Sequence, residues 1–207
     1  GDPATASLTG CIDDLEQQLS AVAAPLLLVG HSGGGAVATQ LAEAISERVV
    51  GVAYLAGMML PSGTSFGEVV AEMVDDYPEA SGIGPYLEWE AEGQVSRVPA
   101  HAIRYIFLID LSCAMAQQVI RRIGPQAEGS RALVPHWTPE RFGQLPRLYV
   151  EARQDRSVVL PVQHQMQQLV PGAQVASLDT GHVPQVAAPE SVADALAKFV
   201  SANSSPT

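Results

Sequence analysis

The sequence predicts an α/β protein with a mostly parallel sheet flanked by helices. Three observations indicate this class. Short, uninterrupted apolar runs occur at 26–29 and 49–55, as in parallel strands that are buried on both faces. Amphipathic helical patterns alternate with such runs, which favours right-handed crossovers. A turn rich in glycine joins the first run directly to the following helix.

The predicted elements follow from these patterns in chain order. Short apolar runs predict strands, and apolar residues at helical spacing predict helices. Strands are expected at 26–29, 49–55, 147–151 and 174–178. Helices are expected at 7–23, 36–47, 161–169 and 189–200, and a polar tail at 201–207.

The middle of the chain has a different character. Residues 61–143 are rich in proline, glycine and aromatic residues, with short helical pieces at 66–74 and within 99–122. We therefore expect an α/β core from 1–60 and 144–207, with 61–143 as a helical lid and not a second domain with a sheet. Its large apolar residues have two interpretations: they contact a hydrophobic or aromatic portion of a substrate, or they form the core of the lid itself. These residues are Trp89, Tyr105, Ile106, Phe107, Leu108 and Trp137.

Composition excludes several classes. The 207 residues are 47% hydrophobic and 16% charged, which argues against disorder. A net charge of −11 argues against nucleic-acid binding, which depends on positive charges that contact the phosphates. The longest apolar stretch, 49–60, ends at Pro61 and is too short to span a bilayer. Cys11 and Cys113 lack metal-ligand spacing, so we expect two buried free thiols, although one disulfide between them stays open.

The strongest chemical signal is Gly30-x-Ser32-x-Gly34 between a strand and a helix. This context is that of a nucleophile elbow, in which a strained turn presents a serine hydroxyl above the sheet edge. Side chains at Gly30 and Gly34 are expected to collide where strand and helix approach closely. The glycines do not match a dinucleotide-binding pattern. The helix that starts after Ser32 directs free N–H groups toward developing negative charge.

A serine nucleophile needs a base, normally histidine. His182 follows the last predicted strand, where a loop returns to the carboxyl edge of the sheet. The other histidines are less suitable, because they lie beside the serine, in the lid or on an exposed helix pattern: His31, His101, His136 and His164.

The base needs a carboxylate that orients it. Asp155 directly follows the strand at 147–151 and is preferred for this role. Asp179 is the rival, but it is close to His182 in sequence and belongs to a strand end. Glu151 lies within a strand. For Asp155, a surface ion pair with neighbouring arginines is the alternative reading.

Together these motifs resemble the α/β-hydrolases. The segments are LLVGHSGG (27–34), LAGMMLP (55–61), Gln154-Asp155 and Thr180-Gly181-His182. They are most similar to the branch of plant methylesterases and hydroxynitrile lyases, with its bacterial and fungal esterase relatives. The resemblance implies an α/β-hydrolase fold with Ser32 as nucleophile, Asp155 as acid, His182 as base and the Gly33 N–H as an oxyanion donor. It implies neither cofactor nor metal.

Two departures from that family are visible. Its lyases use a lysine of the cap, whereas Lys198, in the terminal helix, is the only lysine here. Ester hydrolysis is therefore favoured over lyase chemistry. The family also begins with strands and a loop that supplies a second oxyanion donor. Nothing similar precedes Ser32, so we expect a segment ahead of Gly1 whose strands would pair with the otherwise unpaired edge of 26–29.

The leading hypothesis is a serine hydrolase that cleaves a small carboxylic ester with a hydrophobic or aromatic portion. The alternatives are a small-ligand receptor with a silent or slow triad, and a lyase or acyltransferase on the same residues. We expect no nucleic-acid or membrane partner. A homodimer and the cellular compartment are left open, with the cytoplasm favoured.

Overall fold

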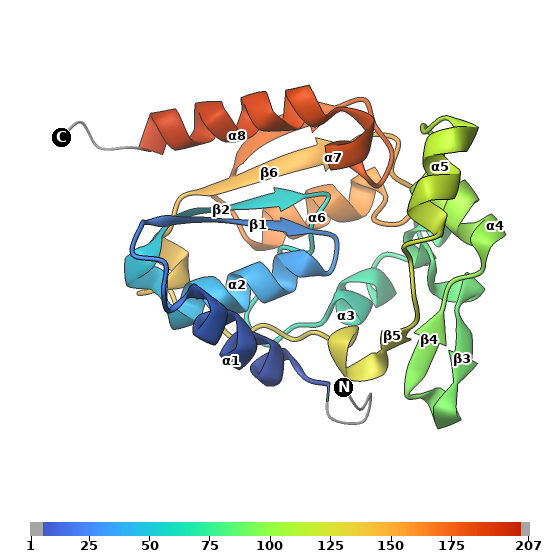
Figure 1. The fold of residues 1–207 in the computed structure, drawn as a ribbon, viewed down its shortest axis with the longest axis horizontal. Helices are drawn as coiled ribbons and strands as arrows, with labels where there is room; N and C mark the ends of the chain where they lie inside the picture. The colour runs from blue at the N-terminus through green and yellow to red at the C-terminus, as the bar shows by residue number, and fades with distance from the viewer. Residues whose placement is uncertain (1–5, 204–207) are drawn as a thin grey trace.

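The structure is a computed structural model that describes residues 6–203. Its main sheet has four parallel strands in the order β1-β2-β6-β7. The strands are β1 (Leu26–His31), β2 (Val49–Leu55), β6 (Arg147–Ala152) and β7 (Gln174–Leu178). All four predicted strands are confirmed. Their carboxyl ends point toward the middle segment, which we define as residues 61–143 (Figure 1).

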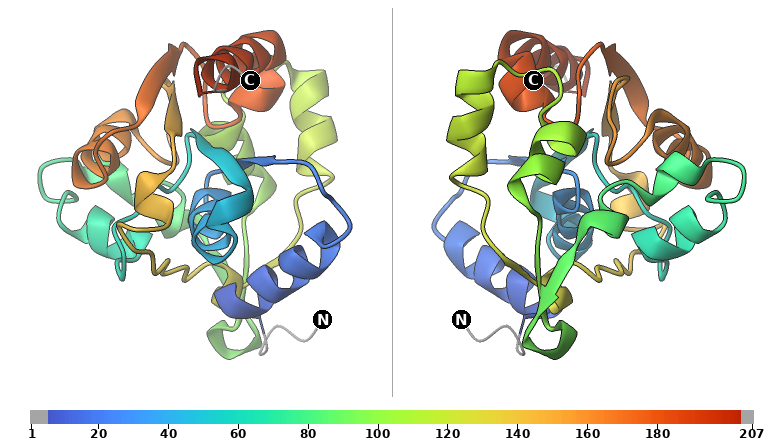
Figure 2. Two further views of the ribbon diagram at one scale, coloured as in Figure 1. Left: turned by 90° about the vertical axis from the view of Figure 1, so that its left-hand side faces the viewer. Right: turned by 90° about the vertical axis from the view of Figure 1, so that its right-hand side faces the viewer.

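Helices cover both faces of this sheet (Figures 1 and 2). Alternating side chains of the strands contact these helices. Tyr54 and Tyr149 face one layer of helices, and Leu55 and Val150 face the opposite side. The first layer contains α1 (Leu8–Leu19), α2 (Gly34–Ala44) and α6 (Leu160–Leu169), and α8 (Pro189–Asn203) lies on the other face. The sheet is therefore a buried α/β core, as the alternation of patterns predicted.

Strand β1 lies at an edge of the sheet. Within residues 6–203 it pairs only with β2, and its other edge has no neighbouring strand. The expectation that 26–29 is buried on both faces is wrong, because Val29 is 45% exposed. The predicted unpaired edge is present. The expected segment ahead of Gly1 stays a prediction.

The middle segment contains short helices and a small sheet. The helices are α3 (Phe66–Ala71), α4 (Ala100–Ala102) and α5 (Cys113–Ile120), and a π-helix spans Ile103–Phe107. A three-stranded antiparallel sheet joins β3 (Glu88–Glu90), β4 (Val95–Arg97) and β5 (Gln126–Ala127). The expectation of a helical segment did not include this small sheet. Strands this short show no visible alternation, and β5 joins the β3–β4 hairpin from a distant part of the middle segment.

The two cysteines differ from expectation in their burial. Cys11 and Cys113 are free, but both are exposed and not buried. Helix α1 packs against the core through Leu8, Ile12 and Leu15, so the covered stripe is too narrow to include Cys11. In the described part of the chain, no helix has both the length and the apolar character needed to cross a membrane.

Candidate active site

Ser32 lies in the turn between β1 and α2, at the carboxyl edge of the sheet. Its φ of 52° is in the left-handed region, which costs an L-residue about 1–2 kcal/mol. Three backbone hydrogen bonds hold the turn: Ser32 N donates to Leu55 O (3.3 Å), and both Gly35 N (3.0 Å) and Met58 N (2.8 Å) donate to Ser32 O. This combination of strain and support is the geometry of a nucleophile elbow.

The glycines around Ser32 have unequal roles. A Cβ at Gly30 would lie 2.5 Å from Gly34 O, so this position requires glycine, as expected. The steric reason expected at Gly34 is wrong, because a Cβ there would meet nothing within 4 Å. The crowded position is Gly35, where a Cβ would lie 2.6 Å from Met58 N. The close contact therefore occurs at Gly35 and not at Gly34, because α2 packs there against Met58 in the segment after β2.

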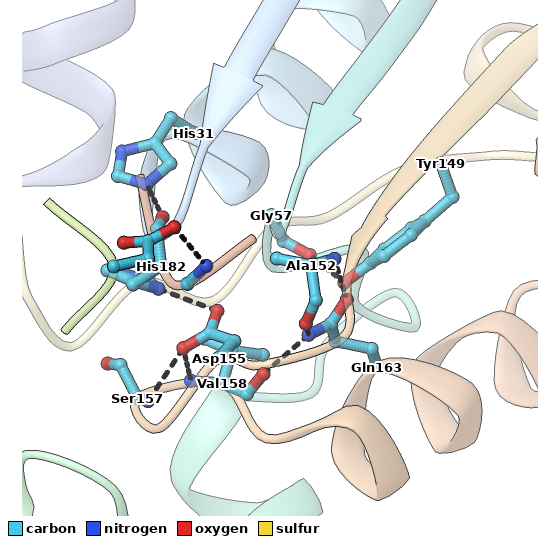
Figure 3. Close-up of polar contacts among 11 residues, drawn as sticks. His31, Gly57, Tyr149, Ala152, Asp155, Ser157, Val158, Gln163 and His182 are labelled. Carbon is cyan, nitrogen blue, oxygen red and sulfur yellow. Dashed lines mark hydrogen bonds and ion pairs between the residues drawn. The ribbon is translucent and has the colours of Figure 1, made fainter. Parts of the chain in front are cut away.

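Asp155 and His182 form a buried pair (Figure 3). Asp155 Oδ2 lies 2.8 Å from His182 Nδ1, in hydrogen-bond contact. The other oxygen, Asp155 Oδ1, accepts hydrogen bonds from the backbone N–H groups of Ser157 (2.7 Å) and Val158 (3.0 Å). These donors fix the carboxylate, and the carboxylate in turn orients the imidazole through Nδ1. The loops after β6 and β7 thus bring a buried carboxylate and an imidazole into hydrogen-bond contact.

The rival carboxylates have other partners. Asp179 is exposed, with its Oδ1 3.3 Å from Arg153 and 3.0 Å from the Gln154 side-chain amide. Glu151 contacts Ser177, Gln167 and His164 on the same side of β6. The structure therefore brings Asp155, and neither rival, to His182.

His31, directly before Ser32 in the chain, contacts the candidate base His182. Its Nε2 donates to the backbone carbonyl oxygen of His182 (2.6 Å), and the two rings lie 4.8 Å apart. Burial, reinforced by the nearby His182, lowers the pKa of His31 to about 4. His31 is thus a neutral donor that ties the turn of Ser32 to the loop of His182. The position of His31 beside Ser32 argues against a role as base, and no local sequence pattern indicates its contact with the distant His182 loop.

The Gly33 N–H is the candidate oxyanion donor. It lies at the start of α2, and within residues 6–203 it has no hydrogen-bond acceptor. A free N–H at a helix N-terminus favours a developing negative charge. The second donor was expected from a segment ahead of Gly1, outside the described residues.

A cavity of about 480 Å³ opens beside Ser32. Most of its wall is apolar, with side chains from the sheet edge and the middle segment. These include Met58, Phe66, Val70, Leu87, Val98, Phe107 and Leu133. Of the large apolar residues singled out in the sequence, Phe107 alone lines this cavity. Ile106 and Leu108 are core residues, Trp89 and Tyr105 are exposed, and Trp137 packs on Phe142.

Fold and site together define the class of this protein. The family model described as "Alpha/beta hydrolase family" matches residues 1–195, so the chain belongs to the alpha/beta hydrolase family. A pyrethroid hydrolase of Sphingobium wenxiniae is 30% identical over 186 residues, which cover 85% of this chain and 64% of that protein. The chain thus spans less than two thirds of that relative's length.

Solved structures show the same fold. A pyrethroid hydrolase from Sphingobium faniae superposes with a TM-score of 0.81 and 25% identity, over 98% of this chain and 81% of that one. A methylesterase from Arabidopsis gives a TM-score of 0.78 at 18% identity, over 96% and 80% of the two chains. The structural relatives thus include both bacterial and plant proteins.

Proposed function

We propose that the protein is a serine esterase that cleaves a small carboxylic ester with a hydrophobic or aromatic portion. Ser32 is the nucleophile, His182 the base, Asp155 the acid and Gly33 N–H an oxyanion donor. The observation that carries the proposal is the buried Asp155–His182 pair, which His31 connects to the strained turn of Ser32. The relatives named as a pyrethroid hydrolase and a methylesterase support hydrolysis as the reaction class.

The reaction proceeds in two halves. His182 Nε2 takes the proton of Ser32 Oγ, and Oγ forms a bond to the ester carbonyl carbon. The Gly33 N–H stabilises the oxyanion that develops on the carbonyl oxygen. The tetrahedral intermediate collapses, and the alcohol leaves with the proton from His182. Water, deprotonated by the same histidine, then attacks the acyl-enzyme and releases the acid and Ser32. Asp155 stabilises the imidazolium in both halves and keeps its own charge.

Cavity and middle segment fit this reaction. A volume of about 480 Å³ with mostly apolar walls suits the hydrophobic portion of an ester. We propose that residues 61–143 act as a lid over a core formed by 1–60 and 144–207. Most of the cavity wall belongs to this segment, which lies at the carboxyl ends of the strands. Lys198 is exposed on α8 and does not line the cavity, which disfavours lyase chemistry that depends on a lysine.

The decisive experiment is a panel of p-nitrophenyl esters with short, long and aromatic acyl groups, assayed together with labelling by a fluorophosphonate. Wild-type protein is expected to turn over several of these esters and to be labelled at Ser32. Ser32→Ala should abolish both, whereas Ser20→Ala, an exposed serine at the end of α1, should change neither. A receptor would bind such esters without turnover. An acyltransferase would give a different product when an alcohol acceptor is added.

A further inference from the structure

The π-helix in the middle segment ends beside the candidate base. It spans Ile103–Phe107, and π-helical turns are rare and frequently occur at functional sites. The Arg104 guanidinium donates to the carbonyl oxygens of Leu108 and Leu111, the latter at 3.2 Å. These bonds hold the turn after the π-helix in one conformation. Residues 104–111 are therefore held together by hydrogen bonds and do not form a free loop.

Phe107, the last residue of the π-helix, contacts both the base and the cavity. Its ring stacks on the His182 ring with centroids 4.9 Å apart and planes 28° apart. The same side chain lines the cavity into which Ser32 opens. The His182 ring thus has Phe107 and His31 as aromatic neighbours at similar distances. The Phe107 side chain therefore contacts both His182 and any molecule that occupies the cavity.

Asp110 fixes the backbone of the same loop. Its Oδ2 accepts a hydrogen bond from Gly181 N at 2.7 Å, directly before His182. A Cβ at Gly181 would lie 2.9 Å from Asp110 Oδ1 and 3.2 Å from Ile109 Cγ2, so the two turns are in close contact. On the other side of the base, Val183 is buried against Ile103 and Leu108. The middle segment thus holds the loop of His182 on both sides of the imidazole.

We propose that Phe107 and Asp110 are positioning residues that set the alignment of the His182 imidazole toward Ser32. Asp110 anchors the loop, and Phe107 fixes the ring. Because Phe107 also forms part of the cavity wall, the apolar portion of a bound ester presses on the residue that orients the base. Esters that fill the cavity are then cleaved faster than short esters through a better-aligned base, in addition to tighter binding. This inference rests on the proposed esterase function.

The test compares four variants with wild type. Asp110→Ala removes the acceptor for Gly181 N–H, whereas Asp110→Asn keeps a side-chain oxygen in its place. Phe107→Leu removes the stacked ring but keeps an apolar side chain. Tyr105→Leu is the matched control, since Tyr105 belongs to the same π-helix, is 56% exposed and has its ring against the Arg156 guanidinium. Three readouts are used: kcat and KM for a short and an aromatic ester, the rate of fluorophosphonate labelling, and the downfield proton resonance of His182 Nδ1–H.

A misplacement of about 1 Å can cost about 10²-fold in rate, so Asp110→Ala and Phe107→Leu should lose roughly 10- to 100-fold in kcat. KM for the short ester should change much less than kcat, and labelling by the small fluorophosphonate should slow in parallel. The downfield resonance should broaden or shift in both variants. Asp110→Asn should restore most of the rate and the resonance. For Phe107→Leu the advantage of the aromatic over the short ester in kcat should disappear.

Wild-type rates and an unchanged resonance in Asp110→Ala and Phe107→Leu would overturn the inference, as would an equal loss in Tyr105→Leu. A loss confined to KM would also overturn it, because it would make Phe107 a binding residue only. If wild type neither hydrolyses esters nor is labelled, the proposed function fails. The resonance still tests the inference then, because it reports the Asp155–His182 hydrogen bond without turnover.

Discussion

His31 Nε2 donates a hydrogen bond to the backbone carbonyl oxygen of His182, 2.6 Å away. A carbonyl oxygen can only accept, so Nε2 of His31 carries the proton. The residue beside the candidate nucleophile therefore contacts the candidate base through its backbone, while Asp155 holds the ring of the same base from the other side.

This contact predicts a pH dependence of stability. Burial lowers the pKa of His31 from 6.5 to about 4, so between these values the unfolded chain binds more protons than the folded protein. The free energy of unfolding should therefore fall as the pH is lowered from 6.5 to 4, by roughly 3 kcal/mol from this group. His31→Gln keeps an N–H donor without titrating. Urea unfolding of both proteins across this range should show a smaller decline for the variant, and parallel curves would contradict the assignment.

Asp155 and Asp179 should differ sharply as asparagine variants. Asp155→Asn loses the charge that stabilises the imidazolium and favours the wrong tautomer of His182, so ester turnover should fall by about 10⁴-fold. Asp179→Asn should retain most activity, because Asp179 is exposed and its Oδ1 contacts Arg153 and Gln154, not His182. Measurement of kcat/KM with one p-nitrophenyl ester decides between them. A dead Asp179 variant beside an active Asp155 variant would refute the assignment of the acid.

The strained backbone of Ser32 gives a second prediction for that position. Ser32→Ala and Ser32→Gly should both lose esterase activity by several orders of magnitude, since the nucleophile is gone. Glycine adopts a φ of 52° without steric cost, whereas the Cβ of alanine makes this conformation unfavourable. Ser32→Gly should therefore be more stable than Ser32→Ala by about 1–2 kcal/mol in chemical denaturation. Equal stability of the two variants would mean that the turn relaxes when the hydroxyl is removed.

Gly34 and Gly35 form a matched pair for testing the packing of α2. A Cβ at Gly35 would lie 2.6 Å from Met58 N and 2.8 Å from Met58 O, both backbone atoms that cannot move aside cheaply. Gly35→Ala should therefore destabilise the protein by about 1–3 kcal/mol or more. Gly34→Ala faces open space at the first position of α2 and should be neutral or stabilising by up to about 1 kcal/mol. Urea midpoints measure both effects, and a reversed order would show that α2 packs differently.

The sequence by itself determined the order of strands and helices in the α/β core. The apolar runs at 26–29 and 49–55 and the helical spacing in 36–47 are local patterns, and each reflects the backbone period of its own segment. The glycine-serine turn was equally readable, because the left-handed backbone at Ser32 is a property of a few consecutive residues.

Only the tertiary structure decided which distant residues meet. Asp155 and Asp179 both follow strand ends, yet loop packing brings only Asp155 to His182. The contacts of Phe107 and Asp110 with the His182 loop and the pairing of β4 with β5 left no signal in the sequence. Such contacts join segments far apart in the chain, and they depend on how whole elements pack, which no local period encodes.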